Sequence, residues 1–239
     1  MYLKSILIES QKFPVRDMFP FNIRVINETG RIDISSPVTF FTGENGSGKS
    51  ALLDAVARKS GFLPWGGSKI HRAHHNPYET QLANHVHLDL EPRRPYGFHF
   101  RAEAFFNFAA SLDDILLDDP GRDEYYGGGS LNILSHGESF LAFFRGYSLS
   151  LDGLYILDEP EAALSPRNQV EFVRILMENM LSGNKQYVIA TLSPIILACP
   201  GSEIFSFDTP SIQPIGYKQT GSYNFYRDFL GDSNKFFSI

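Results

Sequence analysis

The chain has 239 residues, 43% of them hydrophobic, which is enough to bury one core and form a single α/β domain. Its 27 acidic and 21 basic residues give a net charge of −6, which argues against a dedicated nucleic-acid binder with a strongly basic surface. The single cysteine, Cys199, excludes an internal disulfide, and no apolar run approaches the roughly 18 residues of a membrane-spanning helix. We therefore expect a cytoplasmic protein without membrane insertion.

Residues 1–42 predict antiparallel strands that lead into a glycine-rich loop. The apolar stretch of Met1–Glu9 is too short for a signal peptide and predicts a strand. Pro14 and Pro20 interrupt the segment that follows.

Residues 43–50 read GENGSGKS, which fits the phosphate-binding pattern G-x-x-x-x-G-K-S/T. The glycines of this pattern let the backbone turn its N–H groups toward an anion, Lys49 is predicted to reach the β- and γ-phosphates, and Ser50 is predicted to ligate Mg²⁺. A buried strand, Val38–Phe41, precedes the loop and a helix, Ala51–Ala57, follows it, so bound phosphates would face a helix N-terminus. The alternative is a glycine-rich turn without a ligand. The predicted nucleotide contacts are Gly43, Glu44, Asn45, Gly46, Ser47, Gly48, Lys49, Ser50 and Ala51.

We expect residues 61–134 to form an insertion that includes a small helical subdomain. Two strands, His85–Leu90 and Tyr96–Phe100, are predicted to pair, and a helix is predicted from Ala102 to Leu117. An acidic, glycine-rich linker is predicted at Asp118–Ser130. The segment has no sustained heptad repeat, so we expect no long coiled-coil arms there.

Basic residues concentrate at Lys69–His75 and at Arg93 and Arg94. These segments could contact nucleic acid when a dimer closes, but a solvated loop is the interpretation we favour. The histidine spacing in Lys69–His75 is compatible with metal ligation, yet no cysteine or carboxylate cluster completes a site, so we predict no metal there.

The segment Leu134–Glu138 reads LSHGE and precedes an apolar run, Ser139–Ser150, that predicts a helix. Here the chain resembles the ABC-class ATPases, whose signature is usually Leu-Ser-Gly-Gly-Gln/Glu. The resemblance implies that Ser135, Gly137 and Glu138 of one subunit close over the γ-phosphate held by the P-loop of another. The same residues also fit a capping box, in which Ser135 and Glu138 satisfy the helix start. His136 stands where the common signature has glycine.

The next segment, Leu154–Leu157, predicts a buried parallel strand that ends in the acidic pair Asp158 and Glu159. Active sites of open α/β sheets lie at this carboxyl edge, so we expect the pair to meet the P-loop. Asp158 is the candidate Mg²⁺ partner, and Glu159 is the candidate base that orients the attacking water. The alternative is an ordinary strand followed by an acidic helix cap.

The string from Asp158 to Pro166, DEPEAALSP, is similar to the Asp-Glu-Pro-Glu-x-x-Leu-His-Pro run of predicted ATPases related to SMC-like and overcoming-lysogenisation-defect proteins. That resemblance places Ala163–Ser165 in the D-loop, which crosses the dimer interface in this class. Similar proteins read Ala-Thr-His-Ser-Pro where this chain has Leu192 in Ala190–Pro194. Leucine cannot contact the γ-phosphate as the histidine does, so either hydrolysis is slow or this segment is not the switch loop.

The resemblance also implies that an N-terminal aromatic residue stacks on adenine, with Phe13, Phe19 and Phe21 as candidates, although core packing is expected for at least two. Arg101 or Glu103 stands where a transporter's Gln loop would lie and could couple the metal site to the helical part or form a surface salt bridge. Further predicted elements are a helix at Arg167–Leu181, strands at Gln186–Ala190 and Glu203–Phe207, and a short helix at Tyr223–Leu230.

Together these features predict a single domain over residues 1–239, an α/β P-loop NTPase of the ABC-ATPase type. We expect a mixed sheet flanked by helices, an N-terminal antiparallel β part and the small helical subdomain. The predicted function is Mg²⁺-dependent ATP binding and hydrolysis by Lys49 and Glu159 in a homodimer that drives an effector or a DNA-associated partner. An ATP-gated scaffold with little hydrolysis and a transporter ATPase subunit are the alternatives.

Overall fold

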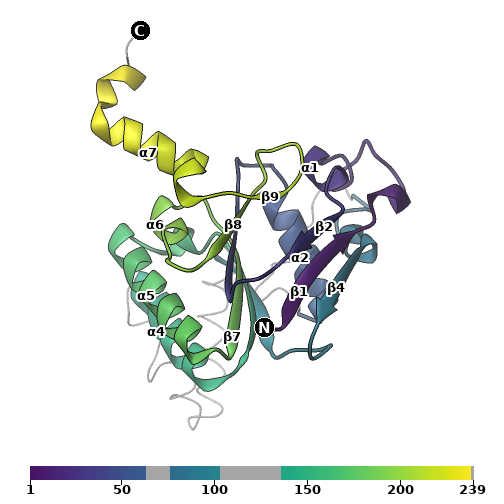
Figure 1. Ribbon diagram of the computed structural model, residues 1–239, viewed down its shortest axis with the longest axis horizontal. Helices are drawn as coiled ribbons and strands as arrows, with labels where there is room; N and C mark the ends of the chain where they lie inside the picture. The colour runs from purple at the N-terminus through teal and green to yellow at the C-terminus, as the bar shows by residue number, and fades with distance from the viewer. Residues whose placement is uncertain (63–75, 103–135, 238–239) are drawn as a thin grey trace.

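The computed structural model describes residues 1–62, 76–102 and 136–237, and it contains two β-sheets separated by a helix (Figure 1). The smaller sheet is antiparallel, with β1 (Leu3–Ile8) between β2 (Arg31–Asp33) and β4 (Val86–Leu90). This confirms the predicted N-terminal antiparallel part for its first two strands. The third strand of residues 1–42, β3 (Val38–Thr42), belongs to the other sheet.

The larger sheet has six strands, of which the first five in spatial order are parallel and the last is antiparallel. A parallel sheet with both faces covered needs strands that are apolar throughout, and its central strands are buried at every position. The mixed sheet flanked by helices is therefore confirmed. Its order is β5 (Gly97–Arg101), β6 (Gly153–Asp158), β7 (Lys185–Ala190), β3, β8 (Glu203–Ser206) and β9 (Gln213–Pro214).

The predicted pairing of His85–Leu90 with Tyr96–Phe100 is wrong. Both segments form strands, but β4 pairs with β1 in the small sheet, whereas β5 pairs in parallel with β6 in the large one. The reason lies in their burial: β4 exposes alternate residues, which suits a sheet with one wet face, while Phe98–Phe100 is buried throughout. The predicted helix Ala102–Leu117 and linker Asp118–Ser130 fall, apart from Ala102, outside the described residues.

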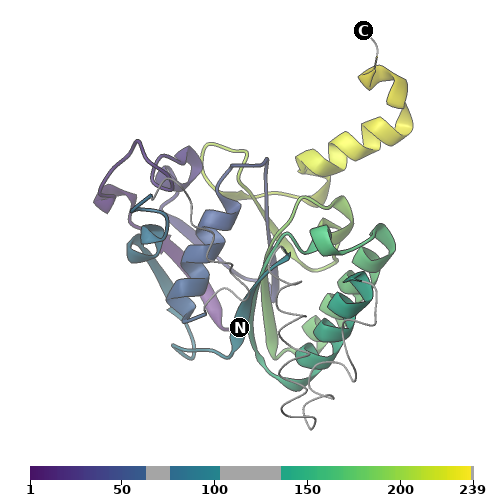
Figure 2. The ribbon, with the colours of Figure 1, turned by 180° about the vertical axis from the view of Figure 1, so that it is seen from behind.

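Helices form two layers around the large sheet, as Figure 2 shows from behind. The P-loop helix α2 (Lys49–Ser60) lies between the two sheets and shares a core with Ile6 and Val86 of the small sheet and Ile156 and Val188 of the large one. The opposite face is covered by α4 (His136–Ser150) and α5 (Pro166–Ser182), whose apolar residues contact the other side of β6 and β7. The helices predicted at Ser139–Ser150 and Arg167–Leu181 are confirmed.

The side chain of Gln186 joins the two sheets. Its Oε1 accepts hydrogen bonds from the backbone N–H groups of Tyr2 (2.8 Å) and Leu3 (2.7 Å), and its Nε2 donates to the Leu3 carbonyl at 2.8 Å. Gln186 is fully buried, so these bonds satisfy a polar group that would otherwise cost stability inside the core. The N-terminal strand is thereby fixed to β7.

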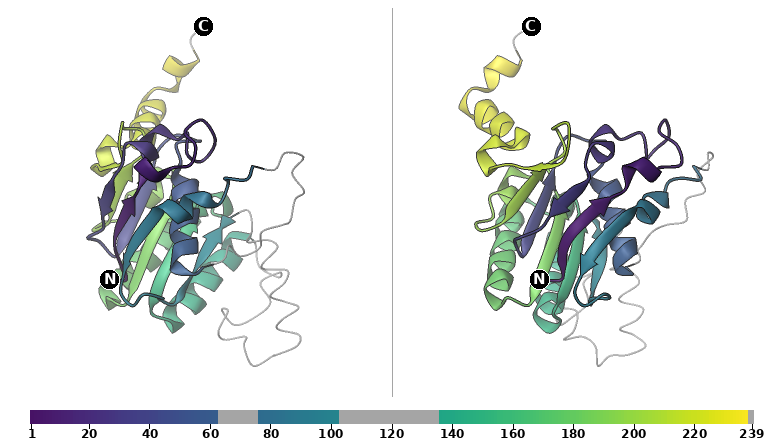
Figure 3. Two further views of the ribbon diagram at one scale, coloured as in Figure 1. Left: turned by 90° about the vertical axis from the view of Figure 1, so that its right-hand side faces the viewer. Right: turned by 45° about the vertical axis from the view of Figure 1, so that its right-hand side comes forward.

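The C-terminal helix α7 (Gly221–Gly231) projects from the body in every view of Figures 1 and 3. None of its residues is buried, and Phe225 and Leu230 are 54% and 78% exposed. The helix predicted at Tyr223–Leu230 is confirmed. Among the described residues, no helix is long and apolar enough to span a bilayer.

The remaining helical elements are short. They are α1 (Arg24–Asn27), α6 (Pro194–Leu197), and the 3₁₀ helices η1 (Ser10–Lys12), η2 (Gln81–His85), η5 (Pro160–Ala163), η6 (Tyr217–Gln219) and η7 (Ser233–Phe236).

Candidate functional site

The P-loop follows β3 and ends at the first turn of α2, as its sequence predicts. Gly43, Gly46 and Gly48 have φ angles of +149°, +82° and +105°, which side-chain-bearing residues rarely adopt. A Cβ on Gly48 would also lie 2.8 Å from Cγ2 of Ile23. The glycines are therefore required both by the backbone conformation and by the neighbouring α1 segment.

Lys49 lies inside this loop and is 3% exposed. Its Nζ donates hydrogen bonds to the carbonyl oxygens of Gly43 and Glu44, the second at 3.0 Å. Burial lowers the pKa of Lys49, while the carboxylates of Glu159 and Asp208 oppose that shift. Ser47 Oγ is buried beside it with no hydrogen-bond partner in the described parts of the chain, so the loop has a polar atom available for a bound phosphate.

Ser50 and Asp158 meet at the carboxyl edge of the sheet. Ser50 Oγ donates a hydrogen bond to Asp158 Oδ1 at 2.9 Å, although 108 residues separate them in sequence. Burial raises the pKa of Asp158 to about 6, against the lowering effects of the Ser50 hydrogen bond and Arg101. A hydroxyl beside a carboxylate at the mouth of a P-loop is the donor set that a hard divalent cation prefers.

Glu159 has φ 51° and ψ 52°, and it is the only non-glycine residue with a positive φ in the described ranges. Its side chain is exposed, and its backbone N–H donates to the Ala190 carbonyl on β7 at 2.9 Å. A left-handed conformation costs roughly 1 kcal/mol or more for such a residue and persists only where the surroundings impose it. The strand end thus turns the Glu159 carboxylate out of the sheet, next to Asp158.

The segment after β7 is attached to Glu161. Glu161 Oε2 accepts from Thr191 Oγ1 at 2.8 Å, and Oε1 accepts from the Leu192 backbone N–H at 2.7 Å. Leu192 lines a groove of about 1290 Å³ that includes the apolar residues Val173 and Ile195 and also Glu161 and Glu44 of the P-loop. The predicted switch segment therefore lies beside the acidic pair, and Leu192 brings an apolar side chain to a groove that reaches the P-loop.

The D-loop residues predicted to cross a dimer interface have two different environments. Ala163 and Leu164 are buried in the subunit's own core at 9% and 5% exposure, whereas Ser165 is exposed. Ser165 caps α5, with its side chain accepting from the Asn168 N–H at 3.3 Å. Of Ala163–Ser165, Ser165 is therefore the exposed residue.

The signature prediction is only partly within the described structure. Ser135 lies outside it, while Gly137 and Glu138 are in the first turn of α4. Glu138 is exposed there. The helix start that the sequence predicts is thus present, and the capping role of Ser135 stays a prediction.

The three aromatic candidates for base stacking are separated by the fold. Phe13 and Phe21 are 9% and 0% exposed and contact each other at a ring-centroid distance of 4.7 Å within the core. Phe19 is 45% exposed and lines a pocket of about 640 Å³ whose wall includes Gly46 and Ser47. Of the three candidates, Phe19 is the one that lines a pocket beside the P-loop.

Arg101 lies at the end of β5 between two carboxylates. Its Nη2 donates to Asp54 Oδ1 at 3.3 Å, and its Nε lies 3.9 Å from Asp158 Oδ2. Asp54 also accepts from Arg58 Nε at 2.6 Å. Arg101 therefore approaches the predicted metal site, while the alternative residue, Glu103, lies outside the described ranges.

Comparison with known proteins agrees with this geometry. A family model described as an AAA domain matches residues 21–58, which contain the P-loop. The structure of cbiO1 from Clostridium perfringens, described as part of the ABC transporter complex cbiONQ, superposes with a TM-score of 0.54 at 16% identity over 98% of this chain and 97% of that one. This chain has the ABC/SMC-type P-loop ATPase fold. An SMC head bound to the C-winged helix domain of ScpA gives a TM-score of 0.50 at 13% identity, over 90% of this chain and 97% of the other. A search among curated proteins found no match.

Asp208 is a site residue that sequence reasoning missed in this ABC/SMC-type fold. Its Oδ1 accepts from the Glu44 backbone N–H at 2.7 Å and so fixes the outer end of the P-loop. The available signal was its place just after β8, because the carboxyl ends of parallel strands meet at one edge. Glu161 belongs to the string DEPEAALSP, which predicts no role for it by itself. In the structure its carboxylate accepts hydrogen bonds from Thr191 and Leu192 and so fixes that segment.

Proposed function

We propose that this domain binds Mg²⁺-ATP and hydrolyses it while closed against a second copy of itself. The observation that carries the proposal is the hydrogen bond of 2.9 Å between Ser50 and Asp158 beside the buried Lys49. These are the three groups that a P-loop site needs for cation and phosphate, and they come from the start of α2 and the end of β6, which are far apart in sequence.

In this proposal the P-loop amides of Gly43 to Ala51 and the Lys49 ammonium hold the phosphates. Ser50 and Asp158 would hold Mg²⁺, which supplies charge neutralisation for the transferred phosphoryl group. Glu159 accepts a proton from, or orients, the attacking water, because its exposed carboxylate follows Asp158 at the sheet edge. Phe19 stacks on the base from the adjacent pocket.

A homodimer would complete each site. Gly137 and Glu138 occupy the first turn of α4. In the second copy, these two residues and Ser135 would present a helix N-terminus to the γ-phosphate bound by the first copy. Ser165 is the exposed D-loop residue available at the same contact. Closure on nucleotide and release after hydrolysis would move an attached effector or DNA-associated partner.

A second function is favoured by the environment of Leu192. Leu192 lines a groove that reaches Glu44 of the P-loop, but its apolar side chain donates no hydrogen bond to a γ-phosphate. Loss of one preorganised donor commonly costs about 10²–10³ in rate, with a smaller effect on binding. The domain would then act as an ATP-held scaffold whose closed state persists because turnover is slow.

Steady-state ATP hydrolysis measured against protein concentration tests the proposal, with Glu159→Gln as the blank. A rate per chain that rises with concentration and vanishes in the variant supports a dimeric ATPase. Tight Mg²⁺-ATP binding with a rate equal to the blank supports the scaffold. Nucleotide affinity that is the same in wild type and Lys49→Met would refute both.

A further inference from the structure

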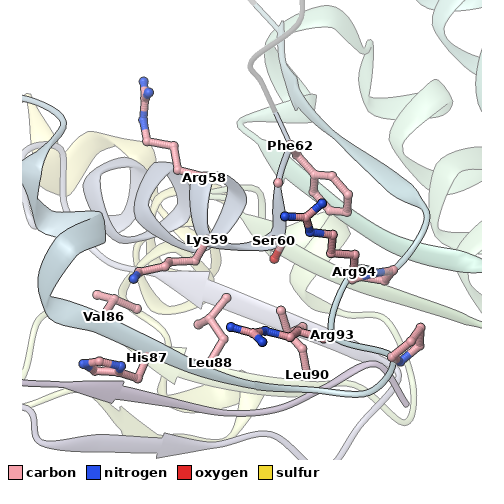
Figure 4. A pocket seen from close by; sticks show the side chains of 13 residues that line it. Arg58, Lys59, Ser60, Phe62, Val86, His87, Leu88, Leu90, Arg93 and Arg94 are labelled. Atoms are coloured by element: carbon pink, nitrogen blue, oxygen red, sulfur yellow. The ribbon is translucent and has the colours of Figure 1, made fainter.

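A second pocket lies at the other end of α2 from the P-loop (Figure 4). It has a volume of about 1150 Å³ and is formed by the C-terminal turn of α2, the inner face of β4 and the connection from β4 to β5. Since α2 has 12 residues and a helix rises 1.5 Å per residue, roughly 18 Å separate this pocket from the phosphate-binding loop. The pocket is therefore distinct from the nucleotide site.

Cationic side chains surround this pocket in a protein whose net charge is −6. Arg58 and His87 are already paired with Asp54 and Glu9. Lys59, Arg93 and Arg94 line the same pocket and have no acidic partner within residues 1–62, 76–102 and 136–237. Three unpaired cations around one concave surface repel each other, and an anion between them relieves that repulsion.

Figure 4 shows how these side chains lie. Arg93 and Arg94 extend from the β4–β5 connection back toward the end of α2, where Lys59 and Ser60 are. The negative end of the α2 dipole, equivalent to about half a charge, opposes an anion here, but three full positive charges outweigh it. The guanidinium group of arginine presents paired N–H donors whose spacing matches two phosphate oxygens. A lysine ammonium acts as a point charge and lacks this match.

Apolar side chains also line the pocket: Val86, Leu88 and Leu90 come from β4, and Phe62 lies on the α2 side (Figure 4). A purely inorganic ion would leave these apolar side chains in contact with water, whereas a ligand with an apolar or planar part would cover them. The volume exceeds that of one phosphate several-fold and lies just above the range of about 300–1,000 Å³ that is common for sites of small organic molecules.

We propose that this pocket binds a small phosphate-bearing organic ligand, with Arg93 and Arg94 holding the phosphate and Lys59 adding charge from α2. The occupied site joins the β4–β5 connection to the end of α2. Binding to the folded state alone stabilises it by mass action, so the ligand also raises the resistance of this region to unfolding.

Calorimetric titration with pyrophosphate tests the phosphate-binding half of the site. The titration is made in a Lys49→Met background, which removes the P-loop cation, and in wild type. We expect one saturable site in Lys49→Met, a loss of affinity of at least tenfold on adding Arg93→Gln and Arg94→Gln, and a change below twofold on adding Arg167→Gln and Lys218→Gln. The control pair lies elsewhere and is exposed, so it alters the net charge equally.

Two further arms test whether the site prefers phosphate to another anion and to duplex DNA. Sulfate should bind at least tenfold more weakly than pyrophosphate, and a labelled 20-base-pair duplex should not compete at 150 mM salt. Equal affinity in the Arg93→Gln, Arg94→Gln variant, equal binding of sulfate, or a tighter duplex that the same variant loses would overturn the proposal. ATP affinity measured with the intact Lys49 separates this outcome from failure of the nucleotide site, because Arg93 and Arg94 do not contact the P-loop in the described structure.

Discussion

Glu161 should be a stabilising residue through two hydrogen bonds rather than through its charge. Its carboxylate accepts from the Thr191 hydroxyl at 2.8 Å and from the Leu192 N–H at 2.7 Å. Glu161→Leu keeps much of the side-chain volume and removes both acceptors, whereas Glu161→Gln keeps an acceptor for the N–H and can donate to the hydroxyl. The pair of variants separates hydrogen bonding from packing.

The expected magnitude follows from the number of groups left without a partner. Thr191 is fully buried, and an unsatisfied buried donor costs about 1–3 kcal/mol. With two donors left without an acceptor, Glu161→Leu should lower the free energy of unfolding by about 2–6 kcal/mol. Burial raises the pKa of Glu161, which means that its ionised form costs stability as the pH rises through that pKa. Glu161→Gln removes this cost and should stay within about 1 kcal/mol of wild type at pH 7.5.

Urea unfolding at pH 7.5 without nucleotide measures these differences through the midpoint at a shared slope. The control is Glu178→Leu, an exposed carboxylate on α5, which should change the free energy of unfolding by less than about 0.5 kcal/mol. If Glu161→Leu is as stable as wild type, or if Glu161→Gln is as damaging as Glu161→Leu, the hydrogen-bond account is refuted.

Three other outcomes are expected. Burial lowers the pKa of His99 to about 4, so between pH 6.5 and 4 the unfolded chain binds a proton that the folded chain does not. As the pH falls to 4.5, the free energy of unfolding of wild type, measured with urea, should therefore drop by about 2–3 kcal/mol more than that of His99→Phe. Parallel pH profiles of the two proteins would contradict this. Phe19→Ala should weaken ATP but not tripolyphosphate binding by roughly tenfold in equilibrium titrations at unchanged stability, whereas Phe13→Ala should lower the free energy of unfolding by about 3–5 kcal/mol. Leu192→His should raise the ATPase rate about tenfold or more over wild type, whereas the control Leu192→Met, which adds no hydrogen-bond donor, should not. Equal rates of wild type and Leu192→His would show that position 192 does not limit turnover.

Local sequence was sufficient for the elements of the site. The P-loop pattern predicted a turn at its glycines, and the apolar run before Asp158 predicted a buried strand that ends in an acidic pair. Both features lie where expected. These features are local because a left-handed glycine and a buried strand are each set by a few consecutive residues. The confirmed helix α5 is equally local, since its apolar spacing repeats with the helical period.

Tertiary structure alone decided which residues from distant segments meet. Strand β5 could have paired with β4, but its burial on both faces placed it beside β6, and this brought Arg101 to Asp158. Asp208 reaches the P-loop only because β8 lies next to β3.

The three N-terminal phenylalanines show the same limit of sequence. Phe13, Phe19 and Phe21 are the same residue type within nine positions, so the local sequence does not distinguish them. The packing around the small sheet and α2 buries Phe13 and Phe21 and leaves Phe19 in the pocket that includes Gly46. Periodicity specifies which face of an element is apolar, whereas the neighbour that covers this face is set by long-range contacts that no local pattern encodes.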